Sequence, residues 1–207
     1  MSALKIKAAF FITISIFSSS VASADILDEL RERQKDVKTL KANFAQEKKT
    51  ALLDRPIKSK GVFYFKSPLG VRWEYEEGLL LLYDGKYLYM YHPEMDAAEK
   101  IKGITGYQGP LNFDIGFLMD EYDIKASKEG DKIRLSLKPK KEMPFKSMEL
   151  LFPPGGAFPM EVKVVEETGD YSVIRFDKIQ SNVKLNDSLF RFTPPPGVQI
   201  RERELME

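Results

Sequence analysis

The apolar positions of the chain follow one period near its start and another further along. Residues 25–40 repeat apolar side chains at spacings of three, four and seven, with charges between them, which is typical of a helix with one apolar face. After residue 59 the spacing becomes two, and Val71, Trp73 and Tyr75 fall on one face of an expected strand. The pattern predicts an N-terminal helix followed by a mainly β chain, in which residues 42–49 already fit a strand.

The strongest turn pattern is Asp84-Gly85, which separates two apolar runs. Asp-Gly suits a two-residue turn, because both central residues of that turn need a positive φ. Such a turn would pair Leu81 with Leu88 and would assign the side chains of both runs to defined faces. One of these faces is purely apolar and consists of Leu79, Leu81, Leu88 and Met90.

Residues 93–122 interrupt the strand pattern. Glycines and a proline precede an apolar run at 111–119 with Gly116 in its middle, which predicts one or two short helices joined by turns. Beyond residue 122 short alternating strands return, the last expected at 188–192. The fold class that follows is mainly β with helices (α+β), and its antiparallel sheet curls toward a barrel.

The first 24 residues have a different character. Two lysines precede an apolar run at 8–18, and Ala22-Ser23-Ala24 is an A-x-A site, so this segment is predicted to be a secretory signal peptide that is cleaved after Ala24. The run is short for a membrane span of about 20 residues, although a retained anchor is the alternative. Residues 25–207 are then expected to form one exported domain. Because the chain has no cysteine, a lipid-modified N-terminus is not expected.

Composition removes several classes of function. The formal net charge is +1, whereas nucleic-acid binders usually have a strong basic excess, so no nucleic acid is expected as a partner. The single histidine, His92, is not accompanied by a nucleophile or metal motif. Catalytic residues, metal ligands and cofactors are therefore not predicted. Paired acids such as Glu76-Glu77 leave an envelope hydrolase as an alternative that no motif supports.

The chain has many apolar faces for its size, and they suit either an ordinary core or a ligand cavity. An acyl chain buried in a cavity would gain about 0.8 kcal/mol per methylene. Under the cavity hypothesis the sheet contributes the following lining residues: Phe63, Phe65, Val71, Trp73, Tyr75, Leu79, Leu81, Leu88 and Met90.

Several motifs in a fixed order support a specific resemblance. They are Phe44-x-Gln46, Gly61-x-Phe63-x-Phe65-Lys66-x-Pro68, Arg72-Trp73-x-Tyr75, Asp84-Gly85-Lys86 and Leu189-Phe190-x-Phe192-x-x-Pro195-x-Gly197. With these motifs the chain resembles the periplasmic outer-membrane lipoprotein carrier family, the LolA type. The resemblance implies an incomplete, half-open antiparallel β-barrel, with an N-terminal helix and short lid helices over a hydrophobic cavity.

The resemblance also implies a function and its partners. Family members are non-enzymatic periplasmic carriers without cofactors, and this chain is expected to be monomeric. They bind the acyl chains of lipoproteins from an inner-membrane ABC transporter and deliver them to an outer-membrane receptor. The receptors share the fold but are lipoproteins, so the missing cysteine favours the carrier role. A module of the same fold that carries or senses a different lipid is the alternative.

The resemblance assigns roles to individual residues as well. It implies that Leu30, Val71 and Trp73 lie at the cavity, and that Phe113 and Phe117 lie in the lid. Studied carriers have a basic lid-closing residue before the proline of the second motif, where this chain has Ser67. The neighbouring cations, Lys66 and Arg72, are therefore the candidates for closing the lid.

Overall fold

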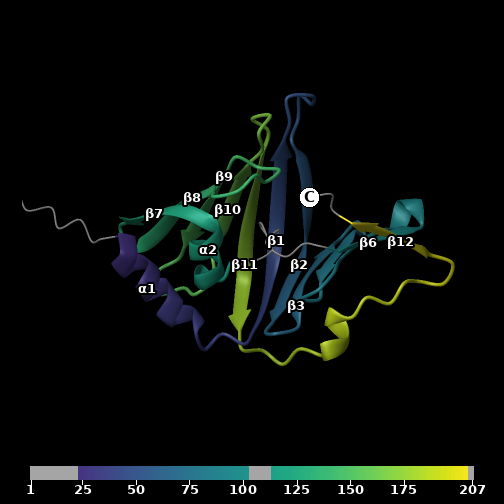
Figure 1. The fold of residues 1–207 in the computed structure, drawn as a ribbon, viewed down its shortest axis with the longest axis horizontal. Coiled ribbons are helices and arrows are strands. Elements are labelled where there is room, and N and C mark those ends of the chain that lie inside the picture. Colours follow the sequence, from purple (N-terminus) through teal and green to yellow (C-terminus); the bar gives the residue numbers. More distant parts are fainter. Residues whose placement is uncertain (1–22, 103–112, 205–207) are drawn as a thin grey trace, which may run out of the picture.

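A computed structural model describes residues 23–102 and 113–204 of the chain. Twelve strands form one sheet in the order β12-β6-β5-β4-β3-β2-β1-β11-β10-β9-β8-β7, so β12 and β7 are its two open edges. Figure 1 shows α1 and α2 against the half of the sheet that ends at β7, whereas the C-terminal segment runs past the other half. This architecture confirms the prediction of a mainly β, incomplete barrel with helices.

The elements follow one another along the chain with short connections. Neighbouring strands are antiparallel except β6 and β12, which are parallel. Among the described helices, none is long and apolar enough to cross a membrane. The bounds are α1 Ser23–Gln34, β1 Thr39–Lys49, β2 Ile57–Lys66, β3 Gly70–Tyr75, β4 Leu80–Tyr83, β5 Leu88–His92, η1 Pro93–Met95, β6 Ala97–Lys102, α2 Ile115–Glu121, β7 Tyr122–Glu129, β8 Lys132–Pro139, β9 Ser147–Phe152, β10 Glu161–Val165, β11 Tyr171–Ser181, η3 Asp187–Phe190 and β12 Gln199–Glu204.

The first helix is shorter than the predicted 25–40. It ends at Gln34, and β1 already begins at Thr39. The side chain of Asn182, which follows β11, accepts a hydrogen bond from the backbone N–H of Lys38 (2.8 Å) and donates one to the carbonyl of Asp36 (3.0 Å). These backbone groups are thus satisfied outside a helix, as the groups beyond a helix end must be. Because Asn182 is so distant in the sequence, the residues around 34–40 do not indicate that the helix ends there.

The predicted register of the hairpin is wrong by two residues. Tyr83 pairs with Leu88 and Leu81 with Met90, so the loop spans residues 84–87. The carboxylate of Asp84 accepts hydrogen bonds from the N–H groups at 86 (2.9 Å) and 87 (2.8 Å), which stabilises the longer loop. Because side chains alternate with a period of two, this shift leaves Leu81, Leu88 and Met90 on the predicted common face.

We call the face of the sheet that α1 and α2 cover the inner face, and the opposite one the outer face. The main core lies at the inner face, where Leu30 of α1 and Leu118 of α2 are fully buried. A second apolar cluster lies at the outer face and comprises Leu82, Ala98 and Phe190. The predicted last strand, 188–192, is therefore wrong: this segment includes part of η3, and it buries Phe190 instead of joining the sheet.

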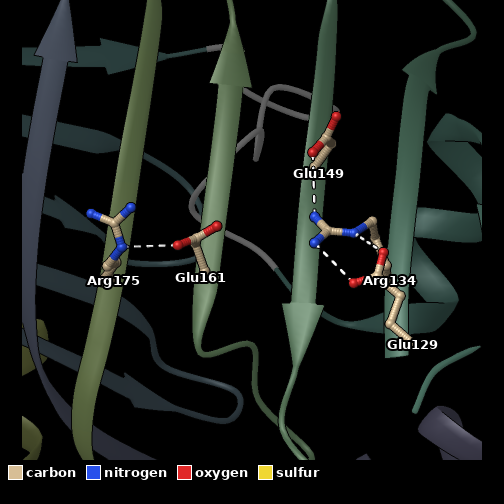
Figure 2. Close-up of polar contacts among 5 residues, drawn as sticks. All are labelled: Glu129, Arg134, Glu149, Glu161 and Arg175. Carbon is tan, nitrogen blue, oxygen red and sulfur yellow. Dashed lines mark hydrogen bonds and ion pairs between the residues drawn. The ribbon is translucent and has the colours of Figure 1, made fainter. Parts of the chain in front are cut away.

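The outer face of β7–β11 is polar, and several of its charges form ion pairs. Figure 2 shows Arg134 between Glu129 and Glu149, and Arg175 beside Glu161 on the neighbouring strand. The hydrogen bond from Arg134 lowers the pKa of the Glu129 carboxyl. Exposed pairs of this kind contribute little stability. They match the ordinary solvated surface of a sheet whose apolar residues point the other way.

Candidate lipid-binding cavity

A cavity of about 260 Å³ lies between the end of α1 and the inner face of β1–β3. Its deeper wall is apolar and includes Leu40, Phe63, Phe65, Val71, Phe113 and Phe158. Its mouth is polar and includes Arg31, Gln34, Lys35, Lys38, Ser67 and Asp114. The volume is just below the range of about 300–1,000 Å³ that is usual for ligand pockets. The arrangement can therefore hold part of an acyl chain, and a longer chain would need the surrounding core to move.

Four of the predicted residues, Phe63, Phe65, Val71 and Phe113, lie in this wall. Phe65 and Val71 face each other across β2 and β3, and Phe63 lies two residues further along the same face. Phe113 comes from the other side, immediately before α2, and its ring centre lies 6.3 Å from that of Phe63. The sheet and the segment before α2 thus meet across the cavity.

Trp73 lies behind the wall in a cluster of aromatic rings. Its ring centre is 4.8 Å from that of Phe63 and 4.9 Å from that of Phe44. The indole is 2% exposed, and its Nε1–H has no hydrogen-bond partner within the described residues. Leaving a buried donor unpaired costs about 1–3 kcal/mol. Because Phe63 lines the cavity and Trp73 packs behind it, the cavity can extend toward Trp73 only if Phe63 moves.

Most of the other predicted lining residues belong to the core beside the cavity. Tyr75 donates its hydroxyl hydrogen bond to Gln46 Oε1 (3.0 Å), and burial raises the pKa of this phenol to about 12. Leu79 precedes β4, outside the core cluster. The remaining five are buried or partly buried members of the core: Leu30, Leu81, Leu88, Met90 and Phe117.

Gln34, the last residue of α1, connects the helix to two segments that line the cavity, one just before α2 and one at Ala157. Its Nε2 donates to the carbonyl oxygens of Phe113 (2.8 Å) and Ala157 (3.0 Å), and its Oε1 accepts from the N–H of Ile115 (2.9 Å). Sequence reasoning missed this residue, although a signal existed. Gln34 follows Leu27 and Leu30 at helical spacing, so it places an amide on an otherwise apolar face.

The predicted lid-closing cations have other partners. Lys66 Nζ donates to Leu185 O (3.1 Å) and pairs with Asp187 (2.5 Å), and Arg72 Nη1 donates to Leu189 O (3.0 Å). Both residues alternate with cavity-facing neighbours, so their side chains extend from the outer face. The contacts to residues 185–189 fasten the C-terminal segment to the sheet, and Arg72 also pairs with Glu74 (2.6 Å). The segments across the cavity are instead bonded to α1 by Gln34 and Arg33.

Residues 35–193 match the family model described as outer membrane lipoprotein carrier protein LolA. The chain belongs to the LolA family. Its relatives include the outer-membrane lipoprotein carrier protein of Legionella pneumophila (strain Paris), 26% identical over an alignment of 205 residues that covers 92% of this chain and 96% of that protein. The protein of the same name from Dechloromonas aromatica (strain RCB) is 27% identical over 187 residues, covering 87% and 89%.

Solved structures support the same fold. An uncharacterized conserved protein from Thermus thermophilus has a TM-score of 0.57 at 13% identity, covering 87% of this chain and 98% of that one. A DUF1329 family protein from Desulfovibrio piger has a TM-score of 0.50 at 12% identity, covering 82% and 97%. The family match begins at residue 35, so Gln34 and the rest of α1 lie before it.

Proposed function

We propose that this LolA-family chain is a non-enzymatic carrier that shelters lipoprotein acyl chains between α1 and the sheet. In this proposal it works in the periplasm after cleavage at Ala24, as a monomer. It receives lipoproteins from an inner-membrane ABC transporter and delivers them to the outer membrane, through a receptor where one is present. Family membership supports the carrier role, and the apolar cavity supports the binding of acyl chains.

The observation that carries the proposal is an apolar cavity between elements held by few polar contacts. Phe63 and Phe65 come from the sheet, whereas Phe113 and Phe158 come from segments that Gln34 holds beside α1. Loading would separate these segments from the sheet. Each methylene that enters gains about 0.8 kcal/mol.

Release requires that this gain be offset. Inserting a chain longer than the cavity would break the hydrogen bonds of Gln34 and part the rings of Phe63 and Phe113. A carrier that loses internal contacts on loading binds its cargo with less net affinity than the buried area suggests. The cargo can then pass to a partner that binds it more tightly.

Depletion of the protein, followed by fractionation of the two membranes, tests this function. Outer-membrane lipoproteins should accumulate in the inner membrane, and the parent gene should restore their distribution. A Phe63→Glu variant, which places a charge in the apolar wall, should fail to restore it, whereas Glu47→Gln on the exposed part of β1 should succeed. Normal sorting after depletion would refute lipoprotein carriage, and mass spectrometry of co-purified lipid would then identify a different cargo.

A further inference from the structure

The mouth of the cavity has an uneven set of charges. Among its lining residues within 23–102 and 113–204, Arg31, Lys35 and Lys38 are cationic, whereas Asp114 is the one carboxylate. Asp114 Oδ1 accepts a hydrogen bond from the N–H of Phe117 (2.8 Å), so this carboxylate serves the start of α2. An apolar wall below and an excess of cations above form an amphipathic site.

Two of the three cations have no carboxylate partner in the part of the chain that the structure describes. Lys35 pairs with Glu32 (2.9 Å), and this partner raises the pKa of the ammonium group, so Lys35 stays charged and its charge is compensated by the carboxylate. Across residues 23–102 and 113–204, Arg31 and Lys38 form no ion pair. Within the same ranges, Lys38 Nζ donates only to the carbonyl of Lys35, at 3.3 Å. Arg31 and Lys38 are therefore the cations at the mouth without an ion pair, and Asp114 lies near the guanidinium of Arg31, beside Gly116.

The backbone that carries Lys38 is firmly placed. Its N–H donates to Asn182 Oδ1 (2.8 Å), and its carbonyl accepts from the N–H of Ser67 (2.9 Å). The turn between α1 and β1 is thus attached to β11 on one side and to the end of β2 on the other. A charged group on a fixed backbone loses less conformational entropy when it binds an anion.

The position of these cations near the end of α1 has a simple explanation in the helix dipole, which favours positive charge there. The helix dipole accounts for positive charge at the end of α1, but it does not account for the position of these charges at the mouth of an apolar cavity. Together the two features match an amphiphile whose chain enters the cavity while its head stays at the mouth. The geometry points to an acyl ligand with an anionic head, a phosphate or a carboxylate, held between Arg31 and Lys38. This inference rests on the proposed acyl-chain cavity and extends its ligands beyond lipoproteins to single lipids with an anionic head.

Binding of single-chain lipids with the same acyl chain and different heads tests the inference. The full chain without its predicted signal peptide is titrated with lysophosphatidylglycerol, with the fatty acid and with the neutral monoacylglycerol, at pH 7.5. Two exposed cations predict that the anionic ligands bind about tenfold more tightly than the neutral one. The two anionic ligands distinguish a phosphate head from a carboxylate head. The preference should shrink as NaCl is raised, because salt screens exposed charges.

A double variant, Arg31→Gln with Lys38→Gln, should abolish the preference for the anionic lipids over the monoacylglycerol. Lys125→Gln with Lys138→Gln removes the same charge from exposed positions on β7 and β8, and it should keep the preference. Equal binding of charged and neutral lipids would overturn the anionic head while the acyl cavity stands. If none of the lipids binds, the proposed cavity itself fails. A preference for anions that survives the first double variant would also overturn the inference, because the cations would then lie elsewhere.

Discussion

Replacing Gln34 by methionine should speed the entry of an acyl ligand into the cavity. Methionine keeps the length of the side chain but cannot form the three hydrogen bonds to the backbone of Phe113, Ile115 and Ala157. Each such bond contributes a net of about 0.5–1.5 kcal/mol. If all three break on opening, the closed state loses about 1.5–4.5 kcal/mol, and the open population rises at least about tenfold.

The association rate of a single-chain lipid is the direct measurement. Trp73 is the sole tryptophan of the chain and lies against Phe63, so its fluorescence reports entry of a ligand in stopped flow. Glu32→Met is the matched control, because it removes a polar side chain from the exposed side of the same helix. Its described partner is Lys35, whose charge at the mouth the variant leaves uncompensated. The ligand is therefore the neutral monoacylglycerol, and its association rate should stay close to that with the parent.

Hydrogen exchange at the Ile115 amide provides a second measurement. This N–H donates to Gln34, so its protection should fall in the methionine variant and persist in the control. An unchanged association rate combined with lost protection would refute the idea that these bonds limit opening. Unchanged protection would refute the bonds themselves.

Three further predictions concern the sheet. The pKa of Tyr75 is raised to about 12, so the neutral phenol stabilises the fold fully below its unfolded pKa of about 10, and this stabilisation is lost as the pH rises toward 12. Tyr75→Phe should flatten the decline of the unfolding free energy with pH, measured by urea unfolding at pH 9.5–11.5. An unaltered decline would assign the pH dependence to other tyrosines. Lys66 lowers the pKa of Asp187, so the ion pair stabilises the fold above the unfolded pKa of aspartate, and this stabilisation is lost as the pH falls through the lowered folded pKa. In Lys66→Met, the hydrogen exchange of the η3 amides should no longer depend on acid pH. An acid dependence that persists in the variant would contradict the pairing. Gly61→Ala should destabilise the fold by about 2 kcal/mol or more, because the added Cβ would lie 1.9 Å from Glu74 O; a melting temperature equal to the parent's would refute the close approach.

The alternation of side chains was predictable, whereas the ends of elements were not. Phe63, Phe65 and Val71 face the cavity because the period of two assigns them to the inner face. The hairpin register depends on which backbone groups Asp84 binds, and the end of α1 depends on Asn182, far along the chain. Neither choice is visible in local spacing. The same limit explains η3, since Phe190 leaves the strand pattern to bury itself on the outer face.

The sequence also did not predict which inner-face side chains line the cavity and which lie behind its wall. Val71 and Trp73 share a face, yet Val71 lines the cavity and Trp73 lies behind it, because Phe63 is opposite Trp73 and separates it from the open space. Period alone assigns a side chain to a face and not to a layer. The amide of Gln34 was detectable as a polar group on an apolar stripe, but its partners come from two distant segments.

The two faces of β2 and β3 determine which side of the cavity can move. Phe65 and Val71 form the wall on the inner face, while their neighbours Lys66 and Arg72 bind the C-terminal segment on the outer face. This segment also buries Phe190 against the sheet, so the wall is supported from behind. The opposite wall contacts α1 through the side chain of Gln34 and through Arg33 Nη1, which donates to Gly156 O (3.3 Å). Under the proposed carrier function, opening would displace the segments at Phe113 and Phe158 while the sheet stays in place.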